Sequence, residues 1–219
     1  PVMLDYFNSI FEEAAFRWDG VNRIYGKTSN EIIRYLEMVS PEFHIDNRFD
    51  IENSYLFDSL YLIRKIANIE RIAILNTLAE QYHVVLHTAS KVDKETLGRV
   101  EVRLPVRPGQ DAAVVYAGSR INLNVSLKGI EGGTAQRVMD IMGAGGFVLT
   151  NYCEETADIF EEDKEIVMFK SPEELFDKVE YYLRHEEERE RIARAGYHKV
   201  TACYTYEKKL QKLLEWVEG

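Results

Sequence analysis

The most informative stretch of this 219-residue chain is Gly133-Thr-Ala-Gln-Arg-Val-Met-Asp-Ile-Met-Gly-Ala-Gly-Gly-Phe-Val-Leu-Thr-Asn151. A pair of glycines, 132–133, precedes apolar residues at helical spacing, and Gly145 and Gly146 are expected to end the helix. The apolar run 147–149 then predicts a short buried strand. Glycine turn, helix and strand in this order are typical of a parallel α/β unit, and many such units are scaffold without a ligand.

The start of this predicted helix has the features of an anion site. A glycine turn that enters a helix exposes backbone N–H groups at the positive end of the helix dipole, which suits a phosphate. We therefore predict that Gly133, Thr134 and Ala135 contact a diphosphate. Arg137 and Asp140 are three residues apart and lie on one helical face. A cation beside a phosphate and a carboxylate that accepts from sugar hydroxyls are what a nucleotide-sugar site requires.

A second polar feature precedes the glycine turn. Asn122 and Asn124 flank Leu123 in the predicted strand 121–125, where asparagine is unfavourable by propensity. Their side chains point to the same face, because side chains alternate along a strand. Two interpretations stay open at this point: the asparagines support a turn by hydrogen bonding, or Asn124 and Ser126 shape the mouth of the site.

Strands and helices alternate through the middle of the chain. Strands are predicted by short β-branched or alternating runs, with helices between the later ones, at 83–88, 99–104, 121–125, 147–150 and 165–169. This alternation predicts an α/β fold, a Rossmann-like parallel sheet flanked by helices, with ligands at the carboxyl edge. Residues 1 to about 80 are predicted to be helical.

The C-terminal part is predicted to be helical from Ser171 to the end of the chain. Ser171 and Pro172 have the pattern of an N-cap and a first helical residue. The charged run 185–195 is most simply a solvated helix face, and Gly196 is expected to end that helix. The chain begins with Pro1 and lacks a conventional start, so we expect a piece of a longer protein.

The composition disfavours several classes of protein. With 27 basic and 37 acidic residues the net charge is −10, so nucleic acid or an anionic membrane would be repelled. No apolar run approaches the roughly 18 residues of a membrane helix, and no signal peptide is evident. Two cysteines form no disulfide framework. We expect a cytoplasmic protein without a transmembrane segment.

The side chains that usually perform chemistry lack recognisable partners. His83 and His87 share a strand face, but no third ligand of suitable type is near, so we expect structural histidines and no metal site. No serine has a nucleophile-elbow context, and neither Cys153 nor Cys203 has a base at a recognisable spacing. A dinucleotide fingerprint is also missing. The sequence therefore predicts no bound cofactor and assigns no catalytic residue.

A series of segments resembles one family in order and spacing. They are 119–126, 137–152, 172–175, 181–189, 192–197 and 205–206. Together they resemble the C-terminal domain of bacterial glycosyltransferases related to the CgeB spore-maturation protein. The resemblance extends over residues 70–215, about two thirds of the chain.

The resemblance implies the GT-B architecture, in which two Rossmann-like domains face each other and the C-terminal one binds the donor nucleotide. It implies that residues 70–219 form this nucleotide-sugar-binding domain. By analogy, residues 1–69 are helices that follow the N-terminal Rossmann domain of longer members. GT-B enzymes generally need no bound metal.

The resemblance also implies a role for one carboxylate. In related GT-B enzymes a carboxylate on the central helix binds the donor ribose, and Asp140 occupies that position where the wider superfamily prefers glutamate. The superfamily has a second glutamate eight residues earlier, where this chain has Gly132. The basic pair that grips the diphosphate in many relatives is not recognisable, and Arg137 is the substitute candidate.

The resemblance and these residues together predict a glycosyltransferase, which the resemblance implies to be of the GT-B type, metal-independent and incomplete as this chain. It would transfer a sugar from a nucleotide-diphosphate-sugar to a glycan, protein or small-molecule acceptor. Two alternatives stay open. One is a non-catalytic nucleotide-sugar-binding module, and the other is an interaction domain whose helical N-terminal part forms a homodimer.

Overall fold

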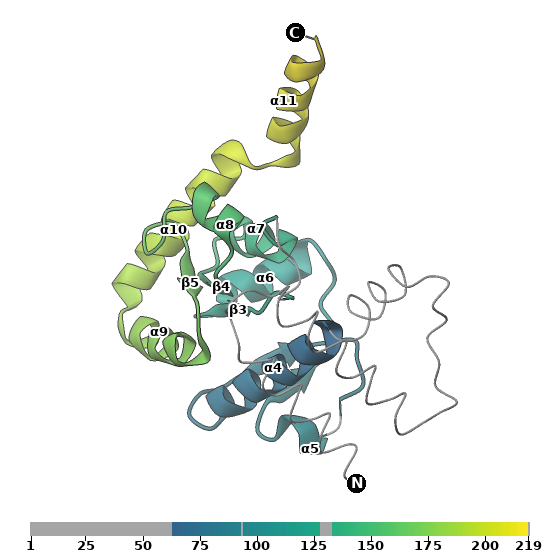
Figure 1. Ribbon diagram of the computed structural model, residues 1–219, viewed down its shortest axis with the longest axis vertical. Helices are drawn as coiled ribbons and strands as arrows, with labels where there is room; N and C mark the ends of the chain where they lie inside the picture. Colours follow the sequence, from purple (N-terminus) through teal and green to yellow (C-terminus); the bar gives the residue numbers. More distant parts are fainter. Residues whose placement is uncertain (1–62, 93, 128–132, 219) are drawn as a thin grey trace, which may run out of the picture. The chain divides into compact units, whose positions relative to one another are not determined.

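The computed structural model describes residues 63–92, 94–127 and 133–218 (Figure 1). The helices predicted within 1–62 lie outside the described residues. The chain divides into two compact units. The first includes the described residues 63–85, 91–92, 94–101 and 127, and the second includes 86–90, 102–126 and 133–218.

The first unit is organised by helix α4, Ile63–Ala79, and the short helix α5, Lys94–Leu97, which pack on one another. Ile74 of α4 is fully buried, and the Asn76 amide donates to the Thr96 carbonyl at 2.8 Å. Strand β1, Val85–His87, pairs with β2, Glu101–Arg103, and each strand has residues in both units. The two strands predicted here are confirmed.

The second unit contains a parallel sheet in the order β3-β4-β5. Its strands are β3, Asn122–Asn124, β4, Val148–Asn151, and β5, Val167–Phe169. Leu149 is the register partner of both Leu123 and Val167. Every residue of β4 and β5 is buried, as expected for parallel strands that are covered on both faces. The predicted parallel α/β fold is confirmed, with the described strands distributed over two sheets.

Helices flank this sheet and supply its core (Figure 1). They are α6, Gln110–Gly118; α7, Gln136–Gly143; α8, Glu154–Ile159; α9, Pro172–Arg184; and α10, Glu186–Cys203. The last helix, α11, Tyr206–Glu218, contacts α10 and extends away from the sheet (Figure 1). The core cluster joins α7, the sheet and α10 through Val138, Ile141, Met142, Val148, Phe160, Ile166, Met168 and Val200. Helix α10 contacts both α7 and α9, and these contacts connect α9 and α10 to this core.

Local chemistry explains where two of these helices begin and end. The Ser171 hydroxyl accepts a hydrogen bond from the Glu174 backbone N–H at 3.2 Å, and Pro172 occupies the first turn of α9, so the predicted N-cap is confirmed. Helix α7 ends at Gly143, and Gly145 has a φ of 79°. This left-handed conformation suits glycine, as the predicted helix end requires.

One expectation about α10 is wrong. Gly196 does not end the helix, which continues to Cys203. A Cβ at Gly196 would lie 2.5 Å from the Glu165 carbonyl oxygen, so glycine permits close packing there. The expected solvated face of the charged run is confirmed, with Glu190 and Arg194 paired at 3.3 Å, and Arg189 is the buried exception, donating to the Tyr182 carbonyl at 2.7 Å. Arg189 thereby satisfies a carbonyl at the end of α9.

Candidate functional site

The candidate site lies at the carboxyl edge of the parallel sheet. The strands run in the same direction, so β3 and β4 both end at this edge, at Asn124 and Asn151. Asn124, Thr150 and Asn151 are buried polar residues at the ends of these strands. In open α/β sheets, ligands bind outside the carboxyl ends of the strands. Gly133 and Thr134 contact Glu155 and Thr156, which follow β4, so the predicted anion site lies near the same edge.

A hydrogen-bonded cluster joins the ends of the two strands. The Asn124 amide nitrogen donates to the Thr150 hydroxyl and to the Ser126 hydroxyl, both at 2.9 Å. The Ser126 backbone N–H donates to the Asn151 side-chain oxygen at 2.7 Å. Because a buried polar group is costly when it lacks a partner, these bonds fix the segment that leaves β3. The role of Asn151 was missed because its contact with Ser126 spans 25 residues of sequence.

The two strand asparagines have different partners. Asn122 donates to the Tyr116 carbonyl at 2.9 Å and to the Phe147 carbonyl at 3.1 Å, so it supports the connections around β3. Asn124 is bonded within the cluster at the strand end. Both asparagines therefore provide hydrogen-bonded support. Donor binding by Asn124 and Ser126 stays a prediction.

The glycine turn is held by the segment that follows β4. Gly133 has a φ of 91°, which favours glycine, and its N–H donates to the Glu155 carboxylate. The hydroxyls of Thr134 and Thr156 lie 3.1 Å apart, within hydrogen-bonding distance. The N–H that we expected to contact a diphosphate is therefore bonded to an internal anion. A phosphate at this N–H would have to displace the Glu155 carboxylate.

Helix α7 presents the other predicted residues. It buries Val138, Ile141 and Met142 and leaves Arg137 and Asp140 exposed. Ala135 is the N-cap residue of α7. Its side chain accepts no hydrogen bond, so it does not satisfy the first backbone N–H groups of the helix. The positive end of the helix dipole and an arginine are thus close in sequence at an exposed helix start. Within the described residues, no hydrogen bond links this group to Asn124 and Ser126.

The histidines of the first sheet have protein partners. His83 Nε2 lies 2.7 Å from a Glu101 carboxylate oxygen, and His87 Nδ1 lies 2.9 Å from the Leu104 carbonyl oxygen.

Across residues 63–92, 94–127 and 133–218, no cluster of three or more histidine, cysteine, aspartate or glutamate side chains has the arrangement of a metal site. In the same ranges, no helix has the length and apolarity to cross a membrane.

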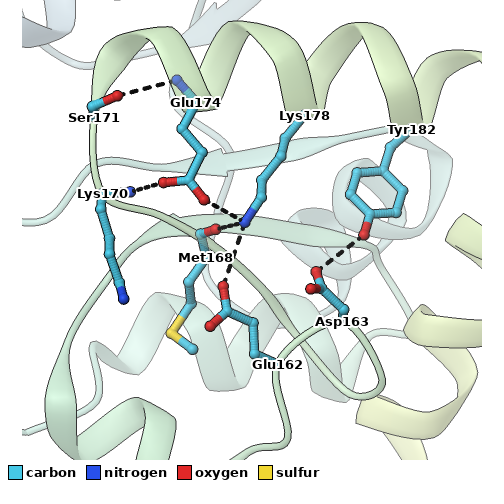
Figure 2. A network of polar contacts seen from close by, with 8 residues as sticks. All are labelled: Glu162, Asp163, Met168, Lys170, Ser171, Glu174, Lys178 and Tyr182. Atoms are coloured by element: carbon cyan, nitrogen blue, oxygen red, sulfur yellow. Dashed lines mark hydrogen bonds and ion pairs between the residues drawn. The ribbon is translucent and has the colours of Figure 1, made fainter.

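A polar network at the end of β5 anchors α9 to the sheet. Figure 2 shows Lys178 donating to the Met168 carbonyl and pairing with Glu174 at 2.8 Å and Glu162 at 3.4 Å. Partial burial opposes the charge on Lys178, but the hydrogen bond and charge of Glu174 raise its pKa above the ordinary value. Burial of Glu174 is likewise outweighed by its bonds to Lys178 and the Lys170 N–H, so its pKa is lowered.

The buried tyrosine of α9 completes this network. The Tyr182 hydroxyl donates to the Asp163 carboxylate at 3.2 Å (Figure 2). Burial, and then the charge of Asp163, raise the pKa of Tyr182 above its ordinary range. Asp163 has a φ of 60°, an unusual conformation for a residue other than glycine. These contacts hold a turn before β5 and stabilise the scaffold that carries the site.

Comparison with known proteins identifies the domain that contains this edge. Residues 69–215 match the family described as glycosyl transferase-like. The chain belongs to this family. The match includes the strand ends, the glycine turn and all of α7, so the glycosyltransferase-like domain contains every predicted donor-binding residue. No curated protein matches the chain.

Family membership supports glycosyl transfer as the function of this domain, with a nucleotide sugar and an acceptor as partners. The parallel sheet of the glycosyltransferase-like domain, with helices beside it, is consistent with a Rossmann-like fold.

Proposed function

We propose that this chain is the donor-binding half of a GT-B glycosyltransferase, related to the CgeB-like bacterial enzymes and cytoplasmic. It would transfer a sugar from a nucleotide-diphosphate-sugar to an acceptor, without a metal or another cofactor. The proposal rests on one observation. The residues that match the family include an exposed helix start at the carboxyl edge of a parallel sheet. The acceptor-facing residues and any catalytic base would belong to the other domain.

The proposed chemistry is displacement of a nucleoside diphosphate from an activated sugar. Negative charge grows on the departing diphosphate, and backbone N–H groups near Gly133, Thr134 and Ala135 would stabilise it together with Arg137. Asp140 lies one turn further along the exposed side of α7 and would accept hydrogen bonds from the donor ribose. This arrangement supplies electrostatic stabilisation without a covalent intermediate.

The proposal is tested first by binding. A thermal-shift panel of UDP, GDP, CDP and dTDP sugars should identify the donor, since a ligand at 100 times its dissociation constant stabilises a protein by about 2.7 kcal/mol. Asp140→Asn keeps the shape but removes the charge. Because hydrogen bonds to charged groups contribute about 1.5–3 kcal/mol, calorimetry should show affinity for the nucleoside diphosphate reduced by at least tenfold.

The control is Asp177→Asn, which removes one exposed carboxylate from α9 and should not change affinity. Equal affinity in Asp140→Asn and in the wild-type chain would remove Asp140 from the donor site. Failure of every nucleotide sugar to bind would contradict the proposed function as a whole.

A second candidate function is favoured by α11. Leu210, Leu213, Leu214 and Trp216 are more than half exposed on this helix. Large apolar surface on a monomer commonly marks an interaction site. We therefore keep an interaction role, with a homodimer as the candidate assembly, beside the glycosyltransferase function.

A further inference from the structure

In the hydrogen-bonded cluster at the ends of β3 and β4, it is fixed which groups donate and which accept. We call it the edge cluster, and it consists of Asn124, Ser126, Thr150 and Asn151. Asn124 and Thr150 are each 3% exposed, so water contributes little to satisfying their polar atoms. The bonds within the edge cluster therefore determine which hydroxyl hydrogens are used inside the protein.

The Asn124 amide nitrogen is a donor only, so each hydroxyl that it contacts must act as an acceptor. It donates one hydrogen to Thr150 Oγ1 and the other to Ser126 Oγ, each at 2.9 Å. The hydroxyl hydrogens of these two residues must therefore point away from Asn124. The Thr150 hydrogen is directed to the Asn151 carbonyl at 3.4 Å.

The Ser126 hydroxyl differs from that of Thr150. In the described part of the chain, no acceptor is found for its hydrogen. Its backbone is also fixed, because its N–H donates to Asn151 Oδ1 at 2.7 Å. Among the described residues, Ser126 thus has one side-chain donor without an acceptor, directly after β3 at the edge where ligands of parallel sheets bind.

We propose that Asn124 and Asn151 are positioning residues that aim the Ser126 hydroxyl hydrogen at an oxygen of the diphosphate-sugar part of the donor. This inference rests on the proposed donor site. Phosphate and sugar oxygens accept hydrogen bonds, and a hydroxyl whose direction is set before binding loses little freedom when the ligand arrives. Asn124 turns the hydrogen away from itself, and Asn151 fixes the backbone that carries it.

One substitution can reverse the direction of the hydrogen bond between residue 124 and the Ser126 hydroxyl. In Asn124→Asp the carboxylate can only accept, so the hydroxyls of Ser126 and Thr150 must turn their hydrogens toward it. Ser126→Ala removes the same hydrogen outright. With the nucleotide sugar that gives the largest thermal shift for the wild-type chain, calorimetry should show each single variant binding roughly tenfold more weakly.

The double variant separates positioning from charge. If Asn124→Asp acts through the Ser126 hydrogen, it should weaken binding no further in a chain that already has Ser126→Ala. If it acted by repelling the diphosphate, the same loss would appear in both backgrounds. Ser126→Thr retains a hydroxyl and should retain affinity, and the parent nucleoside should bind all variants equally.

Folding of each variant is checked by thermal unfolding. If Asn124→Asp does not fold, Asn151→Ala takes its place in the same double-variant comparison, because it releases the Ser126 backbone N–H. Unchanged affinity in Ser126→Ala would overturn the inference and leave the proposed function standing. Equal losses from Asn124→Asp with and without the hydroxyl would overturn the positioning role. A wild-type chain that binds no nucleotide sugar would overturn the proposed function and this inference together.

Discussion

Gly196 lies inside α10 where a side chain has no room. A Cβ there would approach the Glu165 carbonyl oxygen to 2.5 Å and Met142 Cε to 2.6 Å. The first neighbour is backbone and cannot rotate away. We expect Gly196→Ala to lower the free energy of unfolding by about 1–3 kcal/mol, as overpacking does. Urea denaturation measures the change.

The control is Gly118→Ala, because nothing lies within 4 Å of a Cβ at Gly118. This variant should unfold with nearly wild-type stability. If Gly196→Ala is as stable as Gly118→Ala, the close approach of α10 to the turn before β5 is not a determinant of stability.

Glu155 provides a second prediction at the residue scale. Its carboxylate accepts from the Gly133 N–H, which is one of the groups proposed to contact the donor diphosphate. Removing its charge should therefore favour the diphosphate at this N–H. We expect Glu155→Gln to bind the nucleoside diphosphate about tenfold more tightly, with little change for the nucleoside.

The matched control is Glu154→Gln, which removes the same charge one residue away. Calorimetry compares the two. If both variants bind the diphosphate equally well, the effect comes from overall charge and the contact with Gly133 has no specific part in it.

At the scale of elements, the network that anchors α9 to β5 should make stability depend on pH. The pKa of Glu174 is lowered in the folded protein by Lys178 and the Lys170 N–H, which outweigh its burial. The folded carboxyl therefore binds a proton less readily than the unfolded one, so its contribution is present above the ordinary pKa of about 4.3 and is lost as pH falls.

We expect the free energy of unfolding to decrease between about pH 5 and pH 3, and to decrease less in Glu174→Gln. Glu180→Gln is the control, because Glu180 forms an exposed pair with Arg184 on the same helix. Urea denaturation at several pH values measures both variants. Identical pH dependence in Glu174→Gln and the wild-type chain would contradict a role for this network in acid stability.

The sequence predicted correctly those elements whose ends or burial depend on residues close by in the chain. The cap at Ser171 and the buried run of β4 depend on neighbouring residues, so the sequence indicates them directly. Gly196 was misinterpreted because its neighbour, Glu165, is distant in sequence. The partners of Glu155 and Asn151 were missed for the same reason, since both contacts join segments more than 20 residues apart. The candidate residues could be predicted, but their hydrogen-bond directions required the fold.

At the scale of the whole molecule, the apolar face of α11 is the basis of the homodimer candidate. Leu213 is 55% exposed, and its neighbours on the helix are similarly exposed. We expect sedimentation to show a dimer that Leu213→Glu dissociates, because burial of a charge in an apolar interface is costly. Val114→Glu changes an exposed residue of α6 and is the control. A wild-type chain that stays monomeric would contradict a dimer through α11.

The central claim is that the start of α7 binds the donor diphosphate and that Asp140 binds its ribose. A crystal structure of the chain with the nucleoside diphosphate tests this most directly. The account predicts phosphate oxygens within hydrogen-bonding distance of backbone N–H groups between Gly133 and Arg137, with the ribose hydroxyls at Asp140. Phosphates bound more than one helical turn away, about 5.4 Å, would contradict it.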